Sequence, residues 1–342
     1  MIFTVKKLRI YDYLILLASI LFIGLVVYLP GVCAKGGKEG LHLSAKVIIP
    51  SLFPFAVAVL YLMNSPVFKN TKRPVLVVYL LSLIGGYPIG GKLLGELSES
   101  GRISKSDAEK YLPFCVNAGP AFILLAVGKG ILGSIKTGYI LLAAHLLSSI
   151  LITLLFAPKI LTGVTRTQNT PKIKNAGFAE SVKNASGTTL NICAFVVFFS
   201  VINAYLVHFS SSLKRIKYLV FITEVTNAVS RTNNVYFISF LLGFAGISIW
   251  VQIFSVSGNL RTSILKFVLF RLLHGVFSAA ICVLLFKIFR VSTPVISNGQ
   301  AFGLNVFYSN SALAFSLLIM VLLLLINITA KKHTGNLLND VL

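Results

Sequence analysis

Apolar residues gather in long runs along the chain, and short polar or basic stretches separate the runs. The clean runs cover residues 13–29, 47–64, 139–157, 188–209, 267–289 and 312–328. A transmembrane helix needs about 20 consecutive, mainly apolar residues. The pattern therefore predicts an all-α polytopic membrane protein with about 8 apolar helical segments once interrupted runs are included.

Other apolar runs are interrupted by glycine and proline. Residues 74–91 contain GGYPIGG, residues 113–130 contain CVNAGP, and residues 243–252 read GFAGISIWVQ. Glycine weakens a helix, and proline removes a backbone donor and kinks it. Backbone freed in this way at membrane depth must be buried in protein or line a watery cavity. Such runs indicate broken or re-entrant helices around the binding site of a secondary transporter.

The first two interrupted runs are joined by a polar stretch, GELSESGRISKSDAEKYL. Ser104 with Asp107, and Ser106 with Glu109, both have the spacing of a helix capping box. We therefore expect a short amphipathic helix at this point. It would lie as an external strap between the two broken segments.

A polar, basic stretch containing TRTQNTPKIKNAG divides the chain into two halves. In both halves, a glycine-interrupted run precedes a helix with one histidine and a Leu-Phe end. This weak likeness favours two structural repeats. The expected organisation is 1–46 for an N-terminal transmembrane helix and polar connection, 47–158 for the first half, 159–185 for the linker, 186–290 for the second half, and 291–342 for a C-terminal transmembrane helix and tail.

Composition agrees with a membrane protein. Hydrophobic residues make up 56% of the 342-residue chain and charged residues only 12%, against roughly 25% charged residues in a soluble domain. The net charge of +22 comes from 31 Lys+Arg against 9 Asp+Glu. The basic residues lie mostly in connections, where they set topology and contact anionic lipid headgroups. A nucleic-acid partner is therefore not expected.

The chain lacks the motifs of the common enzyme classes. Paired carboxylates, an HExxH motif, a nucleophile elbow and a P-loop are all absent. The four cysteines lie far apart and mostly in apolar runs, which is typical of small buried side chains and of neither a metal site nor a disulfide. We expect no catalytic residue, metal or cofactor, and no ATP-driven pump in this chain alone.

The first interruption has a chemical rationale as an anion site. Where a helix starts after a break, its unpaired N–H groups and positive dipole end point into the gap. Tyr87 would add a hydroxyl or a stacking face, and Lys92 a full positive charge. Alternatively, the glycines permit close helix packing and Lys92 extends to the membrane interface. The candidates are Gly85, Gly86, Tyr87, Pro88, Gly90 and Lys92.

The other two interruptions carry amide side chains. Asn117 has donor and acceptor groups suited to a carboxylate or a ring nitrogen, and Gly119 and Pro120 break the helix just beyond it. Asn117 could instead cap the helix that follows. Gln252 could donate to a solute, or it could hold helices together, as glutamine does in membranes.

Glu224, in FITEVTNAV, is the acidic residue with the longest apolar approach. An ionisable residue within a membrane segment is a functional candidate. Glu224 could bind a coupling proton or Na⁺, with Thr226 and Asn227 supplying neutral oxygens. The alternative is a structural ion pair with Arg231 or Lys217 near the interface.

His145 and His274 occupy matching positions in the two proposed repeats. Each lies in an apolar helix, far in sequence from any acidic partner. Interior histidines with satisfied hydrogen bonds are therefore favoured over a proton relay.

Several motifs, in order, resemble the YlbJ-type sporulation integral membrane proteins. They are SLFPF, GGYPIGGKL, ISKSDAE and FCVNAGPAFILLAVG in the first half, and FITEVTNA, GFAGISIWVQIFS and FRLLHGVFSAA in the second. The likeness runs over about residues 51–280. The chain departs from the family in a compact loop at 69–74 and a short C-terminal tail, which leaves open a divergent paralogue with another solute.

The resemblance implies membership of the wider nucleoside-recognition Gate group, whose architecture is similar to that of concentrative nucleoside transporters. That group includes a mother-cell protein implicated in moving dipicolinic acid towards the developing spore. The resemblance therefore implies a bacterial cell membrane, with a sporulation-stage mother-cell membrane as the specific expectation. The two Gate-type repeats would surround the solute.

The expected function is a secondary transporter or facilitated channel for a small anionic solute, with dipicolinate as the specific expectation. A nucleoside or related small solute is the alternative. An alternative of another class is a structural or assembly protein of sporulation membranes that does not transport. The expected partners are the solute, membrane lipids and a coupling ion, H⁺ or Na⁺, and a homo-oligomer is left open.

Overall fold

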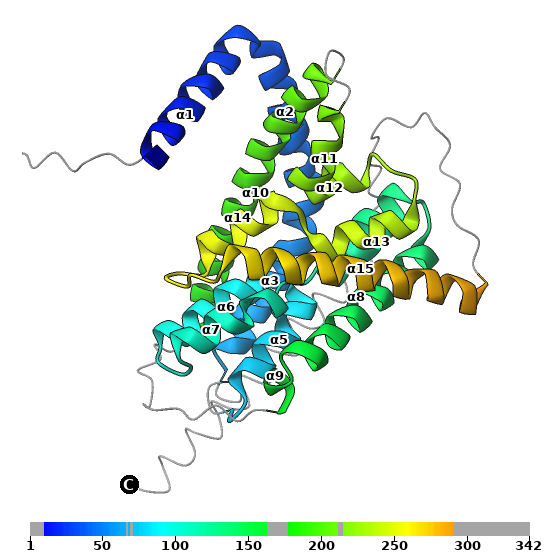
Figure 1. The fold of residues 1–342 in the computed structure, drawn as a ribbon. Helices are drawn as coiled ribbons and strands as arrows, with labels where there is room; N and C mark the ends of the chain where they lie inside the picture. The colour runs from blue at the N-terminus through cyan, green and yellow to red at the C-terminus, as the bar shows by residue number, and fades with distance from the viewer. Residues whose placement is uncertain (1–9, 66–67, 69–70, 163–176, 211–214, 291–342) are drawn as a thin grey trace, which may run out of the picture.

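The computed structural model describes residues 10–65, 68, 71–162, 177–210 and 215–290. Every element in these ranges is a helix, so the predicted all-α fold is confirmed. The predicted C-terminal transmembrane helix and most of the linker lie outside the described residues. Figure 1 shows α15 (Ile264–Phe289) crossing the middle of the molecule, with α5 to α7 on one side and α11 to α14 on the other.

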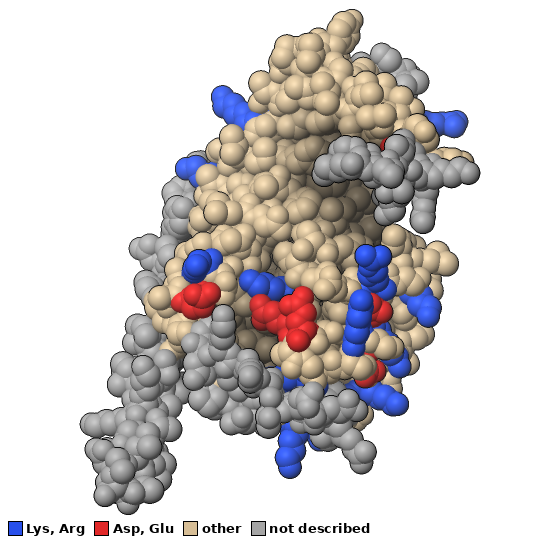
Figure 2. All heavy atoms as spheres, turned by 90° about the vertical axis from the view of Figure 1, so that its left-hand side faces the viewer, with Lys and Arg blue, Asp and Glu red and all other residues tan. Residues whose placement is uncertain are grey.

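Four helical units in the described ranges are long and apolar enough to cross a membrane: α8 (Ile135–Phe156), α10 (Phe178–Phe209), the pair α13–α14 (Val235–Val256) and α15. A fifth candidate is the pair of helices on either side of Leu29, which are bent by 99° relative to one another. On the face in Figure 2, most charged side chains lie in the lower part, a few lie on the sides of the upper part, and a wide uncharged area lies between them. The integral membrane fold is thus confirmed, while the number of about 8 segments stays a prediction.

The N-terminal region differs from the expected polar connection at residues 31–46. Helix α1 (Ile10–Tyr28) is followed by α2 (Pro30–Leu43), a π-helical stretch (Ser44–Ile48) and α3 (Ile49–Met63). Figure 1 shows α2 running beside α10. A Cβ atom on Gly36 would lie 2.6 Å from the Cα of Val201, so the missing side chain lets the two backbones approach. Burial against α10 makes this stretch helical.

The first half contains the two predicted breaks. Helix α5 (Pro74–Gly85) stops at Gly86, whose φ is +82°, and α6 (Ile89–Glu99) starts after Pro88. The predicted strap is α7 (Lys105–Tyr111), and Ser104 is its N-cap because its hydroxyl accepts from the Asp107 N–H at 3.0 Å. Of the two predicted capping pairs, the structure therefore has Ser104 with Asp107.

The second interrupted run begins after a short 3₁₀ turn (Leu112–Phe114). The chain then has no helical structure over residues 116–119 before it re-enters a helix that becomes π-helical over Phe122–Ile131. Helix α8 follows and ends beside the short α9 (Lys159–Thr162).

The second half has breaks of the same kind. A 3₁₀ turn (Ile216–Leu219) leads into α11 (Val220–Thr223), and α12 (Val225–Val229) starts directly after Glu224. Helix α13 (Val235–Phe244) is separated from α14 (Gly246–Val256) by Ala245, whose φ of 73° is left-handed. The predicted interruption near Gly243 is therefore real and is centred two residues later.

Candidate functional site

The first two broken segments pack directly on one another. A Cβ atom on Gly86 would lie 3.1 Å from the backbone nitrogen of Gly119, and one on Gly90 would collide with the carbonyl oxygen of Cys115. Glycine is needed at both positions for close approach, and Gly86 also needs it for its positive φ. This contact brings the GGYPIGG and CVNAGP interruptions together in space.

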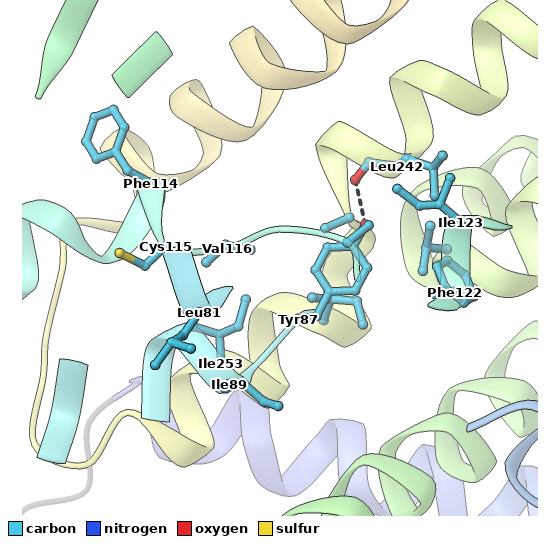
Figure 3. Packing of buried hydrophobic residues seen from close by; sticks show 14 of the residues in the cluster. Leu81, Tyr87, Ile89, Phe114, Cys115, Val116, Phe122, Ile123, Leu242 and Ile253 are labelled. Carbon is cyan, nitrogen blue, oxygen red and sulfur yellow. Dashed lines mark hydrogen bonds between the residues drawn. The ribbon is translucent and has the colours of Figure 1, made fainter. Parts of the chain in front are cut away.

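Tyr87 connects this pair to the second half. Its hydroxyl donates to the carbonyl oxygen of Leu242, near the end of α13, as Figure 3 shows. Its ring meets Phe122 edge-on with centroids 6.5 Å apart. Breaks from both halves are therefore joined through one buried aromatic side chain.

Glu224 forms the break between α11 and α12. Its carboxylate is only 1% exposed and caps α12, accepting from the N–H of Thr226 at 3.0 Å and of Asn227 at 2.7 Å. The amide Nδ2 of Asn227 also donates to it at 3.0 Å. Both carboxylate oxygens of Glu224 therefore accept hydrogen bonds at the start of α12. Among the described side chains, Glu224 makes no ion pair with Arg231.

A small cavity of about 30 Å³ lies between these breaks. Tyr87, Pro88 and Gly119 line it from the first half, and Glu224, Thr226 and Gln252 line it from the second. The rest of its wall is apolar and comes from Ile48, Leu52, Phe122, Ile192, Val196, Val225 and Ile249. Six of the residues proposed from sequence therefore line one cavity, although three come from the first half of the chain and three from the second.

Gln252 is fully buried in α14. Its Nε2 donates to the Ser248 hydroxyl at 3.2 Å within its own helix, and its Oε1 has no hydrogen-bond partner among the described residues. Among the described residues, the Gln252 side chain therefore makes no hydrogen bond to another helix. An unpaired carbonyl oxygen on the wall of the cavity is an acceptor for a ligand donor.

Other predicted residues support the site without lining the cavity. Asn117 is buried, and its Nδ2 donates to the Ser82 hydroxyl at 2.9 Å and to the carbonyl of Phe114 at 3.3 Å. Lys92 extends to α10, where its Nζ lies 2.8 Å from the Thr188 hydroxyl. The predicted residues that stand outside the cavity wall are Gly85, Gly86, Gly90, Lys92, Asn117, Pro120 and Asn227.

The two interior histidines meet where α8 and α15 pack together. Their ring centroids are 4.6 Å apart. His145 Nε2 accepts from the N–H of Ala118 at 2.9 Å, and His274 Nε2 lies 3.2 Å from the carbonyl oxygen of His145. Each ring therefore has one partner, and the Nδ1 of each has none among the described residues. His145 fixes the non-helical segment one residue before Gly119.

Sequence reasoning missed Arg271, which is the largest fully buried side chain of the described residues. Its guanidinium donates to the carbonyl oxygens of Pro113, Val116 and Gly243. A positive charge inside the apolar run FVLFRLLHGVF was the available signal, because an ionisable residue at membrane depth is a functional candidate whatever its sign.

The cavity wall carries several kinds of functional group. It combines the Glu224 carboxylate, an amide oxygen and the aromatic rings of Tyr87 and Phe122. Among the residues that the structure describes, no three His, Cys, Asp or Glu side chains cluster as metal ligands. The carboxylate is suited to a proton or a small cation, and the rings are suited to a planar group.

Comparison with known proteins supports the resemblance in the motifs. No family model matches the chain, and no solved structure matches it. The chain is 24% identical to the sporulation integral membrane protein YlbJ of Bacillus subtilis (strain 168) over 324 residues, which cover 77% of this chain and 79% of the relative. This similarity confirms the prediction of a YlbJ-type integral membrane protein of sporulation.

Proposed function

We propose that this protein is a secondary transporter or facilitated channel for a small anionic solute, with dipicolinate during sporulation as the specific solute. The observation that carries the proposal is the small cavity between broken segments of both halves. Secondary transporters bind their solutes between repeats, at points where membrane helices are interrupted. The family's Gate-type repeats and its relation to nucleoside transporters belong to the same proposal.

The cavity residues have separate roles in this proposal. The rings of Tyr87 and Phe122 contact a planar solute. The second N–H of the Gln252 amide, whose first donates to Ser248, orients its carboxylate. A carboxylate at Glu224 would repel an anionic solute, so a proton or Na⁺ bound there neutralises the repulsion and couples the two fluxes. The protein changes the position of the solute and not its chemistry, so no cofactor or catalytic residue takes part.

The size of the cavity indicates a conformational change. One water needs about 10–15 Å³ of such space, so a cavity of about 30 Å³ is too small for an aromatic dicarboxylate. The described conformation is therefore closed, and the two halves must move apart to admit solute. The breaks at Gly86, Glu224 and Ala245 are the points at which helix halves can rock around the site.

The test is a flux measurement on purified full-length protein in proteoliposomes. Labelled dipicolinate should accumulate faster than in protein-free vesicles, and unlabelled dipicolinate should compete. Gly86→Leu should lower the rate at least tenfold, because a side chain at a positive φ would press on Gly119. Gly187→Ala is the matched control, since its added Cβ meets no atom within 4 Å.

Labelled uridine in the same vesicles tests the nucleoside alternative. If the vesicles take up uridine but not dipicolinate, the protein is a transporter whose solute is a nucleoside. If the protein moves neither compound while a known carrier works in parallel, the transport proposal is wrong. A structural role in sporulation membranes then becomes the better account, and Gly86→Leu, Lys92→Ala and Asn117→Ala proteins of normal abundance should support normal spore development.

A further inference from the structure

Arg271 is a full positive charge in the interior of a membrane protein, on α15 and 2% exposed. An arginine side chain does not lose its proton in proteins. In the described ranges, the one ion pair is between Lys105 and Glu109, at 4.0 Å, and Arg271 takes no part in it. A buried charge without a counter-ion is costly. The guanidinium is held by neutral backbone carbonyls alone.

Those carbonyls belong to broken segments of both halves. Pro113 and Val116 lie in the run that leads to Gly119, and Gly243 lies at the end of α13. The Nε of Arg271 is buried and has no partner among the described residues. The side chain therefore has donor capacity left, and a carboxylate would be a stronger acceptor than the carbonyls that it now holds.

Arg271 is close to the wall of the cavity. The Tyr87 hydroxyl donates to the carbonyl of Leu242, and the Arg271 guanidinium donates to the carbonyl of the next residue, Gly243, at 3.5 Å. Figure 3 shows Tyr87 and Leu242 facing one another, with Val116 in the adjacent segment. Tyr87 lines the cavity on one side and contacts the residue before the Gly243 carbonyl on the other. A small movement of Tyr87 would open a route from the cavity to the guanidinium.

The charges of the site require such a group. The cavity wall contains Glu224 and no lysine or arginine. Lys92, the cation expected from sequence, is engaged with α10. An anionic solute would therefore meet a negative wall unless another cation takes part. A guanidinium has the planar pair of donors that binds a carboxylate through two hydrogen bonds.

We propose that Arg271 is the carboxylate-binding residue of the solute site. In the closed conformation it holds the carbonyls of the broken segments, and it exchanges them for a solute carboxylate when Tyr87 moves aside. Releasing Val116 and Gly243 frees the two halves to move, so binding of the anion and opening of the breaks are linked. The inference rests on the proposed transport function and names the residue that recognises the anion.

The test compares Arg271→Gln and Arg271→Lys with wild type in the proteoliposome assay. Two competitors are used, unlabelled dipicolinate and the uncharged pyridine-2,6-dicarboxamide. Arg271→Gln should raise KM for dipicolinate at least tenfold, and Arg271→Lys severalfold, because an ammonium group cannot form the paired contact. Inhibition by the diamide should change less than twofold. Lys266→Gln, which removes an exposed cation from the same helix, should leave KM unchanged.

If Arg271 has a structural role only, the expected outcome of this comparison is different. In that case recognition of dipicolinate and of the diamide would weaken by the same factor, or KM would stay unchanged while the amount of active protein fell. Either outcome overturns the inference and leaves transport by the wild type intact. Absence of uptake by the wild type would instead overturn the proposed function.

A measurement on the wild type keeps the inference testable if neither variant folds. Protein with ¹⁵N-labelled arginine is mixed with dipicolinate labelled with ¹³C at its carboxyl groups, and dipolar coupling between them is measured by solid-state NMR. Direct contact should give a coupling that an excess of unlabelled dipicolinate removes. If no coupling is found at saturating dipicolinate, Arg271 does not bind the carboxylate.

Discussion

Glu224 and Ser104 perform the same local task in different surroundings. Each side chain accepts hydrogen bonds from the first N–H groups of the helix that follows it. Ser104 does so at the surface, whereas Glu224 does so in the interior, as a wall of the cavity. A serine hydroxyl would suffice for capping. We propose that the carboxylate cap beside the cavity has a second role in binding a cation.

Replacing Glu224 separates these two roles. Glu224→Gln keeps one side-chain oxygen as an acceptor for α12, so it should cost at most about 1 kcal/mol of stability. It should also make uptake insensitive to an imposed pH or Na⁺ gradient, because no carboxylate remains to bind the coupling ion. Thermal unfolding in detergent and flux under each gradient check the two parts.

Ser104→Ala is the control for lost capping alone. It should lower stability by about 1 kcal/mol through α7 and leave the gradient dependence of uptake unchanged. If Glu224→Gln protein responds to both gradients as wild type does, Glu224 is a structural cap and the coupling ion binds elsewhere.

At the scale of elements, the packing of α2 on α10 depends on glycines one helical turn apart. A Cβ atom on Gly40 would lie 2.6 Å from the Cα of Val197, and Gly36 makes the equivalent contact with Val201. Helices in lipid gain little from the hydrophobic effect when they associate, so close backbone contact supplies the attraction. The spacing of Gly36 and Gly40 places both on the face towards α10.

Gly40→Ala should therefore destabilise the protein by about 1–3 kcal/mol, the usual cost of overpacking. Gly37→Ala is a matched control in the same helix, because its Cβ would lie 4.0 Å from the nearest side-chain atom of Val201. That substitution should be neutral or stabilising by up to about 1 kcal/mol, since alanine favours a helix over glycine. Equal losses of stability in both variants would contradict close packing of α2 on α10.

The helix breaks could be predicted from sequence because glycine and proline act locally. Gly86 and Gly119 each lie at a break, and the break predicted near Gly243 is at Ala245. The break at Glu224 was not predicted, because FITEVTNAV contains neither glycine nor proline. The α2 helix could not be predicted in this way, since PGVCAKGGKEGLHL contains four glycines and becomes helical only through packing against α10. Local propensity is overridden there by a tertiary contact.

The directions of long side chains were the least predictable part of the site. Lys92 lies three residues beyond the start of α6, where either the cavity or α10 is within reach of a four-carbon stem, and the structure has it on α10. Asn117 stabilises the first break through its hydrogen bond to Ser82. The cation that we propose for the site is Arg271, whereas the sequence predicted Lys92. The residue types in the sequence indicated which functional groups the site contains. The packing of the side chains decided which residue supplies each group.

On the scale of the whole molecule, the two halves meet along the α8–α15 contact and around the cavity. The paired rings of His145 and His274 lie at that contact, and each half contributes breaks to the cavity wall. A protein of sporulation membranes that only crossed or stiffened the bilayer would have no need of interrupted helices in its interior. The central claim is therefore that the cavity is the solute site.

Solute protection of a cysteine at Thr226 tests that claim most directly. Thr226 lines the cavity, whereas Thr189 is equally buried on α10 and does not. Thr226→Cys and Thr189→Cys are made in a chain without its four native cysteines that retains dipicolinate uptake. Labelling by a small maleimide in proteoliposomes is then followed with and without dipicolinate. We expect saturating dipicolinate to slow labelling at 226 at least tenfold and to leave labelling at 189 unchanged. Equal labelling at 226 with and without dipicolinate, in protein that transports it, would contradict the account.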